Sequence, residues 1–148
     1  MTNSAFAATA AGNMTVRLTI TNECKVQTGG DLNFGSHGVI DANLDQTTLI
    51  GVQCTSGQTY NVGLGVGKGS GATLAVRKMT SPAAATINYT IYRDSARTLV
   101  WGETVGTDTV TGTGDGNVQN ITAYGRVPAQ LTPAAGDYTD TVAITVTY

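Results

Sequence analysis

The chain has 148 residues, a formal net charge of −2 and only 12% charged residues. Its length suits one domain with a substantial core. The charge excludes a nucleic-acid partner, because no basic cluster is present to neutralise phosphates. No apolar run approaches the roughly 18 residues that cross a bilayer, so we expect no membrane insertion.

Glycine, with 19 residues, and threonine are abundant. Thr, Val, Ile and Tyr favour strands and Gly marks turns, so this composition predicts an all-β protein. Residues 1–12 are small and featureless, and we expect them to be flexible. Ala5-Phe6-Ala7 and Ala8-Thr9-Ala10 have the A-x-A form that ends secretory signals, which is compatible with a signal-peptide remnant.

Residues 13–21 form the clearest pattern near the N-terminus. Apolar residues alternate there with threonines and Arg17, which is the periodicity of a strand with one apolar face. Only three residues, 21–23, separate this strand from the first cysteine. So short a connection favours projection away from the domain over folding back onto it.

Further strands are predicted from alternating apolar residues between Gly-, Asp- and Pro-containing turns. They cover residues 24–27, 48–54, 60–66, 74–79, 87–92, 118–127 and 138–148, with a weaker strand inside 106–116. No segment shows helical periodicity. Strands at this spacing predict a β-sandwich.

The last predicted strand runs to the final residue of the sequence. Its inward face carries Tyr138, Val142, Ile144, Val146 and Tyr148. We expect no later strand to cover its edge, and an exposed apolar edge pairs readily with another chain. The hypothesis is that residues 13–21 of one copy fill this edge in the next copy, which would make the protein a polymer subunit.

Cys24 and Cys54 are the two cysteines, and they form no C-x-x-C motif. A metal site would need about four ligands, and the single His37 does not complete one. We therefore favour a disulfide over two buried thiols, and a disulfide indicates an oxidising compartment. Closing a loop of this length would stabilise the fold by roughly 3–4 kcal/mol.

No catalytic constellation is predicted. The glycine-rich run at 63–71 fits no phosphate-loop pattern, since Lys68 is followed by Gly69. His37 lies outside any G-x-S-x-G elbow, and most acidic residues fall in predicted turns. Trp101 is expected in the core, not on a sugar-stacking surface. We therefore expect no catalytic residue, cofactor or metal, and no enzyme activity.

Several segments together resemble one known family. They are Leu32-Asn33-Phe34-Gly35, Val52-Gln53-Cys54-Thr55, residues 87–94 with Trp101-Gly102, Gly125-Arg126-Val127-Pro128, and residues 136–141. In this order, over roughly residues 13–148, they are similar to the spore coat protein U domain, the pilin type of archaic chaperone–usher pili.

The resemblance implies an incomplete immunoglobulin-like β-sandwich over residues 22–148, completed by a donor strand from a neighbouring identical subunit. It implies delivery by a periplasmic chaperone to an outer-membrane usher. The chain would be a shaft subunit of an extracellular, cell-surface pilus for adhesion and biofilm formation, with a tip adhesin as a further partner. Carried onto this sequence, the donor residues are Met14, Val16, Leu18 and Ile20, and the acceptor groove contains Val142, Ile144 and Val146.

Two other functions stay open at this point. One is a secreted spore-coat or matrix-type protein of the same domain that no usher assembles, and dependence on a chaperone and usher would separate it from a pilin. The other is a carbohydrate-binding β-sandwich module or hydrolase. Glycan binding that is lost on Trp101→Ala would favour that reading.

Overall fold

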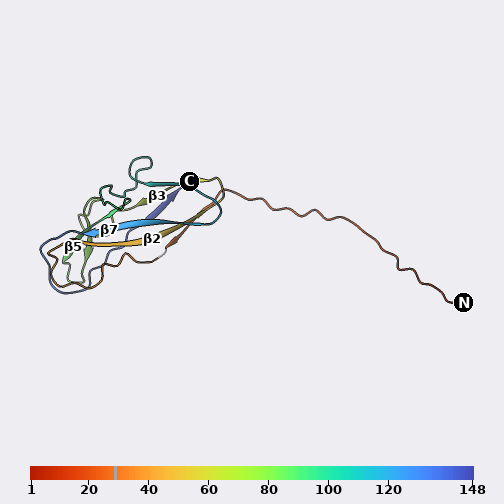
Figure 1. Ribbon diagram of the computed structural model, residues 1–148, viewed down its shortest axis with the longest axis horizontal. Helices are drawn as coiled ribbons and strands as arrows, with labels where there is room; N and C mark the ends of the chain where they lie inside the picture. Colours follow the sequence, from red (N-terminus) through yellow and green to blue (C-terminus); the bar gives the residue numbers. More distant parts are fainter. Residues whose placement is uncertain (29) are drawn as a thin grey trace.

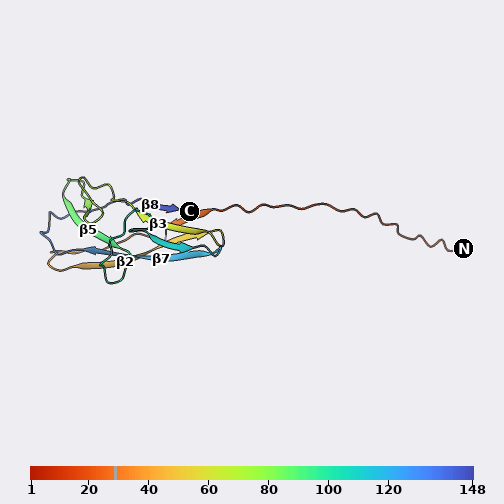
Figure 2. The same ribbon diagram turned by 90° about the horizontal axis from the view of Figure 1, so that it is seen from above.

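The computed structural model describes residues 1–28 and 30–148, and these residues contain strands and no helix. The predicted all-β sandwich is confirmed, with β2 and β7 in one layer and β3 and β8 in the other (Figure 2). The strands are β1 (Cys24–Thr28), β2 (Leu44–Cys54), β3 (Thr59–Leu64), β4 (Arg77–Thr80), β5 (Thr86–Tyr92), β6 (Val110–Thr113), β7 (Val118–Val127) and β8 (Ile144–Thr147).

The larger sheet has the antiparallel order β1-β2-β7-β5-β4. Its centre is the long β2–β7 pair, in register from Leu44 opposite Val127 to Gln53 opposite Val118. Alternation along β2 turns Ile50, Val52 and Cys54 toward the other sheet, where all three are buried, as their spacing predicts.

The smaller sheet has the order β6-β3-β8. The predicted strand over residues 60–66 is too long, because β3 ends at Leu64 and Val66 is 38% exposed. The chain turns at Gly67, whose φ is +85°, and the Lys68 amide donates to the Asp140 carboxylate at 2.7 Å. This side-chain hydrogen bond holds the chain in the turn that follows β3.

Two other predicted strands are shorter in the structure. The strand expected over 74–79 is β4, which begins at Arg77, and the strand expected over 138–148 is paired as β8 only at Ile144–Thr147. The earlier part of that last segment forms an isolated bridge, in which Thr139 exchanges hydrogen bonds with Thr80 of β4. Asp140 then accepts from the Tyr89 hydroxyl at 2.7 Å, which anchors the segment before β8 begins.

The core lies between the two sheets, and twelve apolar residues of the described part of the chain are buried in it. These are Ile40, Ile50, Val52, Cys54, Tyr60, Val62, Leu64, Tyr89, Ile91, Trp101, Ala123 and Val127. Trp101 is 0% exposed, and its indole N–H donates to the Val62 carbonyl at 2.8 Å. The indole therefore has both the apolar contact and the hydrogen-bond acceptor that a buried tryptophan requires.

Arg77 is a buried cation at the end of this core, with 0% exposure. Its guanidinium donates to the backbone carbonyls of Gly65, Leu64, Trp101 and Leu74 at 2.7–3.1 Å. Burial lowers the pKa of Arg77, and nearby acidic groups oppose that shift. One side chain thus joins the end of β3 to two loops that follow it in the sequence.

Leu32 and Phe34, which follow β1 in the sequence, pack against the core. Leu32 and Phe34 cover Gly125 of β7, where a Cβ atom would lie 2.6 Å from Leu32 Cδ2 and 2.9 Å from Phe34 Cζ. A larger residue at position 125 would therefore displace the ends of both side chains. The Phe34 ring also meets the Tyr89 ring edge-on, with centroids 6.5 Å apart.

Candidate functional site

The N-terminal segment, residues 1–22, extends away from the sandwich (Figure 1). Its alternating apolar side chains are almost fully exposed: Met14 87%, Val16 85%, Leu18 85% and Ile20 71%. Residues 14–20 are predicted as a strand, but they have no strand assignment here because no second strand lies beside them. Such a row of exposed apolar residues is unusual for a soluble chain unless a partner covers it.

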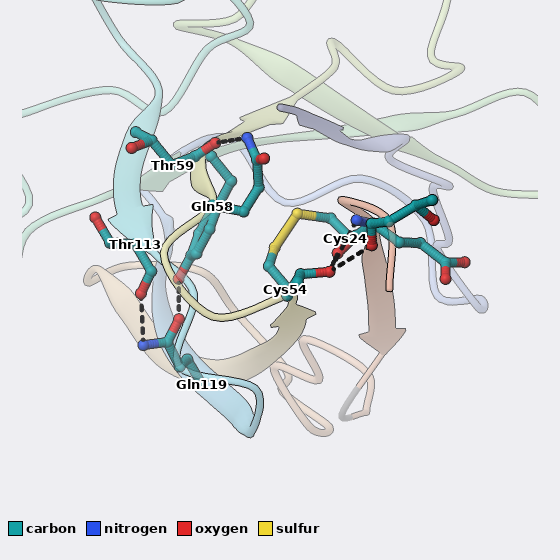
Figure 3. The surroundings of a disulfide bond; sticks show 10 residues. Cys24, Cys54, Gln58, Thr59, Thr113 and Gln119 are labelled. Atoms are coloured by element: carbon teal, nitrogen blue, oxygen red, sulfur yellow. Dashed lines mark hydrogen bonds between the residues drawn. A yellow bond between two sulfur atoms is a disulfide. The ribbon is translucent and has the colours of Figure 1, made fainter. Parts of the chain in front are cut away.

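A disulfide holds the root of the N-terminal segment. Cys24 on β1 and Cys54 on β2 are directly opposite each other, with Cα atoms 4.1 Å apart, and the predicted bond between them is confirmed (Figure 3). The backbone ladder continues one residue further, where the Thr55 amide donates to the Glu23 carbonyl at 2.9 Å. The N-terminal segment therefore leaves the domain from a covalently fixed edge strand.

The edge of β8 that faces away from β3 pairs with no strand of the described residues. Gly65 donates to the Ala143 carbonyl at 3.0 Å, so odd-numbered residues of this segment form the hydrogen-bonded pairs with β3. Because hydrogen-bonding direction alternates along a strand, the backbone groups of Ile144 and Val146 point to the unpaired edge. Thr139 is also odd-numbered, and its backbone groups point away from the unpaired edge, toward Thr80 of β4.

The edge of β1 opposite to β2 is also unpaired within the described residues. Glu23 and Thr55 form a hydrogen-bonded pair, so the backbone groups of Cys24 and Val26 point away from β2. Val26 lies opposite the fully buried Val52, hence on the inward face, and is nevertheless 38% exposed. An inward-facing valine that water reaches indicates that the sandwich is incompletely covered here.

These two edges border what we call the open edge, between β1 and β8. Val142, Ile144 and Val146 lie on its β8 side, half-buried and packed against the core. At their closest, Cα atoms of β1 and β8 lie within 8 Å, less than the roughly 9.5 Å between two strands with a third between them. A strand that fills the open edge must therefore part its two sides slightly.

Sequence reasoning assigned neither Val26 nor Thr55 to this site. Val26 lies in a short strand, between the polar residues Lys25 and Gln27. This alternation over five residues was the signal that could have placed Val26 on the inward face. Thr55 follows the second cysteine in an apparent turn. Its hydroxyl contacts the root of the N-terminal segment, 32 to 34 residues earlier, which no local pattern reveals.

The residues considered for other chemistry lie apart. His37 Nε2 is 2.6 Å from the Phe34 carbonyl in an exposed loop, and Trp101 is too deeply buried to stack on a sugar. Among residues 1–28 and 30–148, no group of three or more His, Cys, Asp or Glu side chains is placed to hold a metal. The same residues include no helix long and apolar enough to cross a membrane.

The fold is similar, with a TM-score of 0.65 and 21% identity, to a chain of the CsuC–CsuE chaperone–tip adhesion subunit pre-assembly complex from archaic chaperone–usher Csu pili of Acinetobacter baumannii. That likeness covers 88% of this chain but only 41% of the other, so this chain spans about two-fifths of its length.

The sequence comparisons cover nearly the whole chain. Protein U of Myxococcus xanthus is 34% identical over 156 aligned residues, which cover 96% of this chain and 87% of that protein. The family model of the Spore Coat Protein U domain matches residues 10–145. The resemblance noted in the sequence is thereby confirmed, and the chain belongs to the Spore Coat Protein U domain family.

Proposed function

We propose that the protein is a shaft subunit of a chaperone–usher pilus and polymerises head to tail by donor-strand complementation. Met14, Val16, Leu18 and Ile20 of one copy would occupy the open edge of the next copy. The observation that carries this proposal is that one chain has both an exposed segment with alternating apolar residues and an apolar sheet edge that no described strand covers. Strand addition to a sheet edge is an established mode of recognition.

The donor segment is long enough to follow the open edge. Residues 14–20 in extended form span about 23 Å, which exceeds the length of the four-residue strand β8. Four apolar side chains buried at about 1.5–3 kcal/mol each would contribute roughly 6–12 kcal/mol. The backbone groups of Val26, Ile144 and Val146 would gain hydrogen bonds from the inserted strand on both of its sides.

The positions of the termini favour one direction of insertion. β8 runs toward the end of the sandwich at which the N-terminal segment leaves, as both ribbon views show (Figures 1 and 2). A donor strand antiparallel to β8 would place its own domain beyond the opposite end. Each copy then leaves its N-terminal segment free for another, and this heterologous contact extends into an open filament.

The domain division, 1–12 flexible, 13–21 donor strand and 22–148 acceptor domain, belongs to this proposal. So do a periplasmic chaperone, an outer-membrane usher and a tip adhesin as partners, secretion through the periplasm to the cell surface, and a role in adhesion and biofilm formation. Support comes from family membership and from the fold shared with a subunit of archaic chaperone–usher pili. The role is structural, and no catalysis is assigned to the chain.

Electron microscopy of the purified chain, with and without residues 1–21, tests the proposal. The full chain should form filaments and the truncated chain should stay monomeric. A synthetic peptide of residues 13–21, added in excess to the truncated chain, should raise its melting temperature because it fills the open edge. Filaments from the truncated chain, or a peptide without effect, would refute donor-strand assembly.

A coat- or matrix-type protein is the second candidate. It is favoured by the description of the family, Spore Coat Protein U domain, and by the 34% identity to Protein U, which covers 96% of this chain and 87% of that protein. Deletion of a cognate chaperone and usher distinguishes the two. Surface display that survives both deletions would favour the coat-type protein.

A further inference from the structure

We propose that the hydroxyl of Thr55 keeps the N-terminal segment directed outward and so prevents it from filling the open edge of its own domain. This inference rests on the proposed donor-strand function. Thr55 would act as a positioning residue, because it contacts the root of the donor segment and not its apolar face.

Self-insertion is a real alternative in this fold. β1 begins at Cys24 and borders the open edge, so a tight reversal at residues 21–23 would lay residues 14–20 beside β1 as the second strand of a hairpin. That strand would enter the same opening that a neighbour's donor strand would fill. A chain completed in this way would be a stable monomer unable to polymerise.

A reversal that turns the apolar residues toward the core must place Ile20 opposite Cys24, because Cys24 and Val26 lie on the inward face of β1. A type I turn from Ile20 to Glu23, followed by a one-residue bulge, gives this register and needs the Glu23 amide as its closing donor. That amide is already bound in the structure. The Thr55 hydroxyl oxygen accepts from the Glu23 amide at 3.0 Å, and the hydroxyl donates to the Thr21 carbonyl at 3.1 Å.

The backbone of Thr55 strengthens this arrangement. Its amide donates to the Glu23 carbonyl at 2.9 Å, which extends the β1–β2 ladder past the disulfide. The Glu23 carbonyl oxygen is also 3.3 Å from the Thr55 hydroxyl oxygen. This carbonyl is therefore a second acceptor, besides that of Thr21, for the single hydroxyl proton. The connection from Thr21 to Glu23 is therefore held extended at both of its ends, directly beside the Cys24–Cys54 bond.

The test compares refolding of four full-length chains: wild type, Thr55→Val, Thr55→Ser and Thr59→Val. Valine keeps the shape of threonine and removes the hydroxyl, whereas serine keeps the hydroxyl. Thr59 is an exposed threonine at the start of β3, and it controls for loss of a hydroxyl elsewhere. Each chain is refolded at low micromolar concentration, and monomer is separated from polymer by size-exclusion chromatography.

Thr55→Val should raise the fraction of heat-resistant monomer about five- to tenfold, as expected when one or two modest hydrogen bonds are lost. Thr55→Ser and Thr59→Val should match wild type. If Thr55→Val polymerises like wild type, or gives only heat-labile monomer, the positioning role is refuted while donor-strand assembly stands. If wild type forms no polymer that depends on residues 13–21, the proposed function fails, and this inference fails with it.

Discussion

Replacing Leu18 with Asp is the sharpest test of the donor strand at the level of one side chain. Leu18 is 85% exposed in the isolated subunit, so it makes almost no contact with its own domain. The substitution should leave the domain folded, with its disulfide formed and its near-ultraviolet circular dichroism unchanged. Any loss of assembly then reports contacts made between copies.

The expected magnitude follows from burial. A leucine that becomes buried on insertion contributes about 2–3 kcal/mol, and burying an unpaired carboxylate costs several kcal/mol more. A total of at least about 4 kcal/mol corresponds to roughly a thousandfold weaker association per subunit. The critical concentration for polymerisation, measured by sedimentation, should rise by about that factor.

Thr19→Asp is the matched control for Leu18→Asp. It adds the same charge one residue away, on the opposite face of the extended segment. Its critical concentration should stay within a few-fold of wild type. Filaments of normal length from Leu18→Asp, or equal losses from both variants, would refute the assignment of residues 14–20 as an apolar donor face.

Three further predictions concern the stability of the domain. Arg77→Ala should lower the free energy of unfolding by at least about 3 kcal/mol in urea titrations, because it leaves buried carbonyls without donors and opens a cavity. Asp45→Asn should lower the free energy of unfolding by no more than about 1 kcal/mol at pH 7, since the ion pair of Asp45 with Arg126 is partly exposed. The bidentate hydrogen bond from Arg126 lowers the pKa of Asp45, so the stabilisation is present above the unfolded value near 3.9. This stabilisation is lost as pH falls through the pKa of Asp45 in the folded state. Wild type and Asp45→Asn should therefore become equally stable in acid, and a difference that persists there would contradict the prediction. Replacing both cysteines, Cys24 and Cys54, with serine should cost roughly 3–4 kcal/mol, and an unchanged urea midpoint would contradict the structural role of the disulfide.

Much of the framework could be predicted from periodicity. The strand predicted over 118–127 matches β7 at both ends, because its alternation is bounded by Gly116 and Pro128. In contrast, β2 begins at Leu44, four residues before the predicted start at residue 48. The prediction began too late because Asp45, Gln46 and Thr47 are polar and show no strand alternation. Their pairing with β7, including the ion pair of Asp45 with Arg126, holds them in the sheet, and this partner is distant in sequence.

Contacts between residues far apart in the sequence were harder to predict. Arg77 occurs in a weakly patterned segment, where an arginine ordinarily indicates a solvated surface, yet it is completely buried. Its role depends on carbonyls of β3 and of the loop at Trp101, which only the folded chain brings together. Thr55 likewise acts on residues more than thirty positions earlier. Local patterns can predict strands, but not contacts of this range.

Hydrogen exchange at β8 tests the central claim most directly, because adjacent amides serve as each other's control. The Thr145 amide faces β3 and should be protected in monomer and polymer alike, whereas the amides of Ile144 and Val146 face the open edge. Donor-strand insertion predicts that these two exchange rapidly in a monomer lacking residues 1–21 and become strongly protected in filaments. Rapid exchange of Ile144 and Val146 in well-formed filaments would contradict the account.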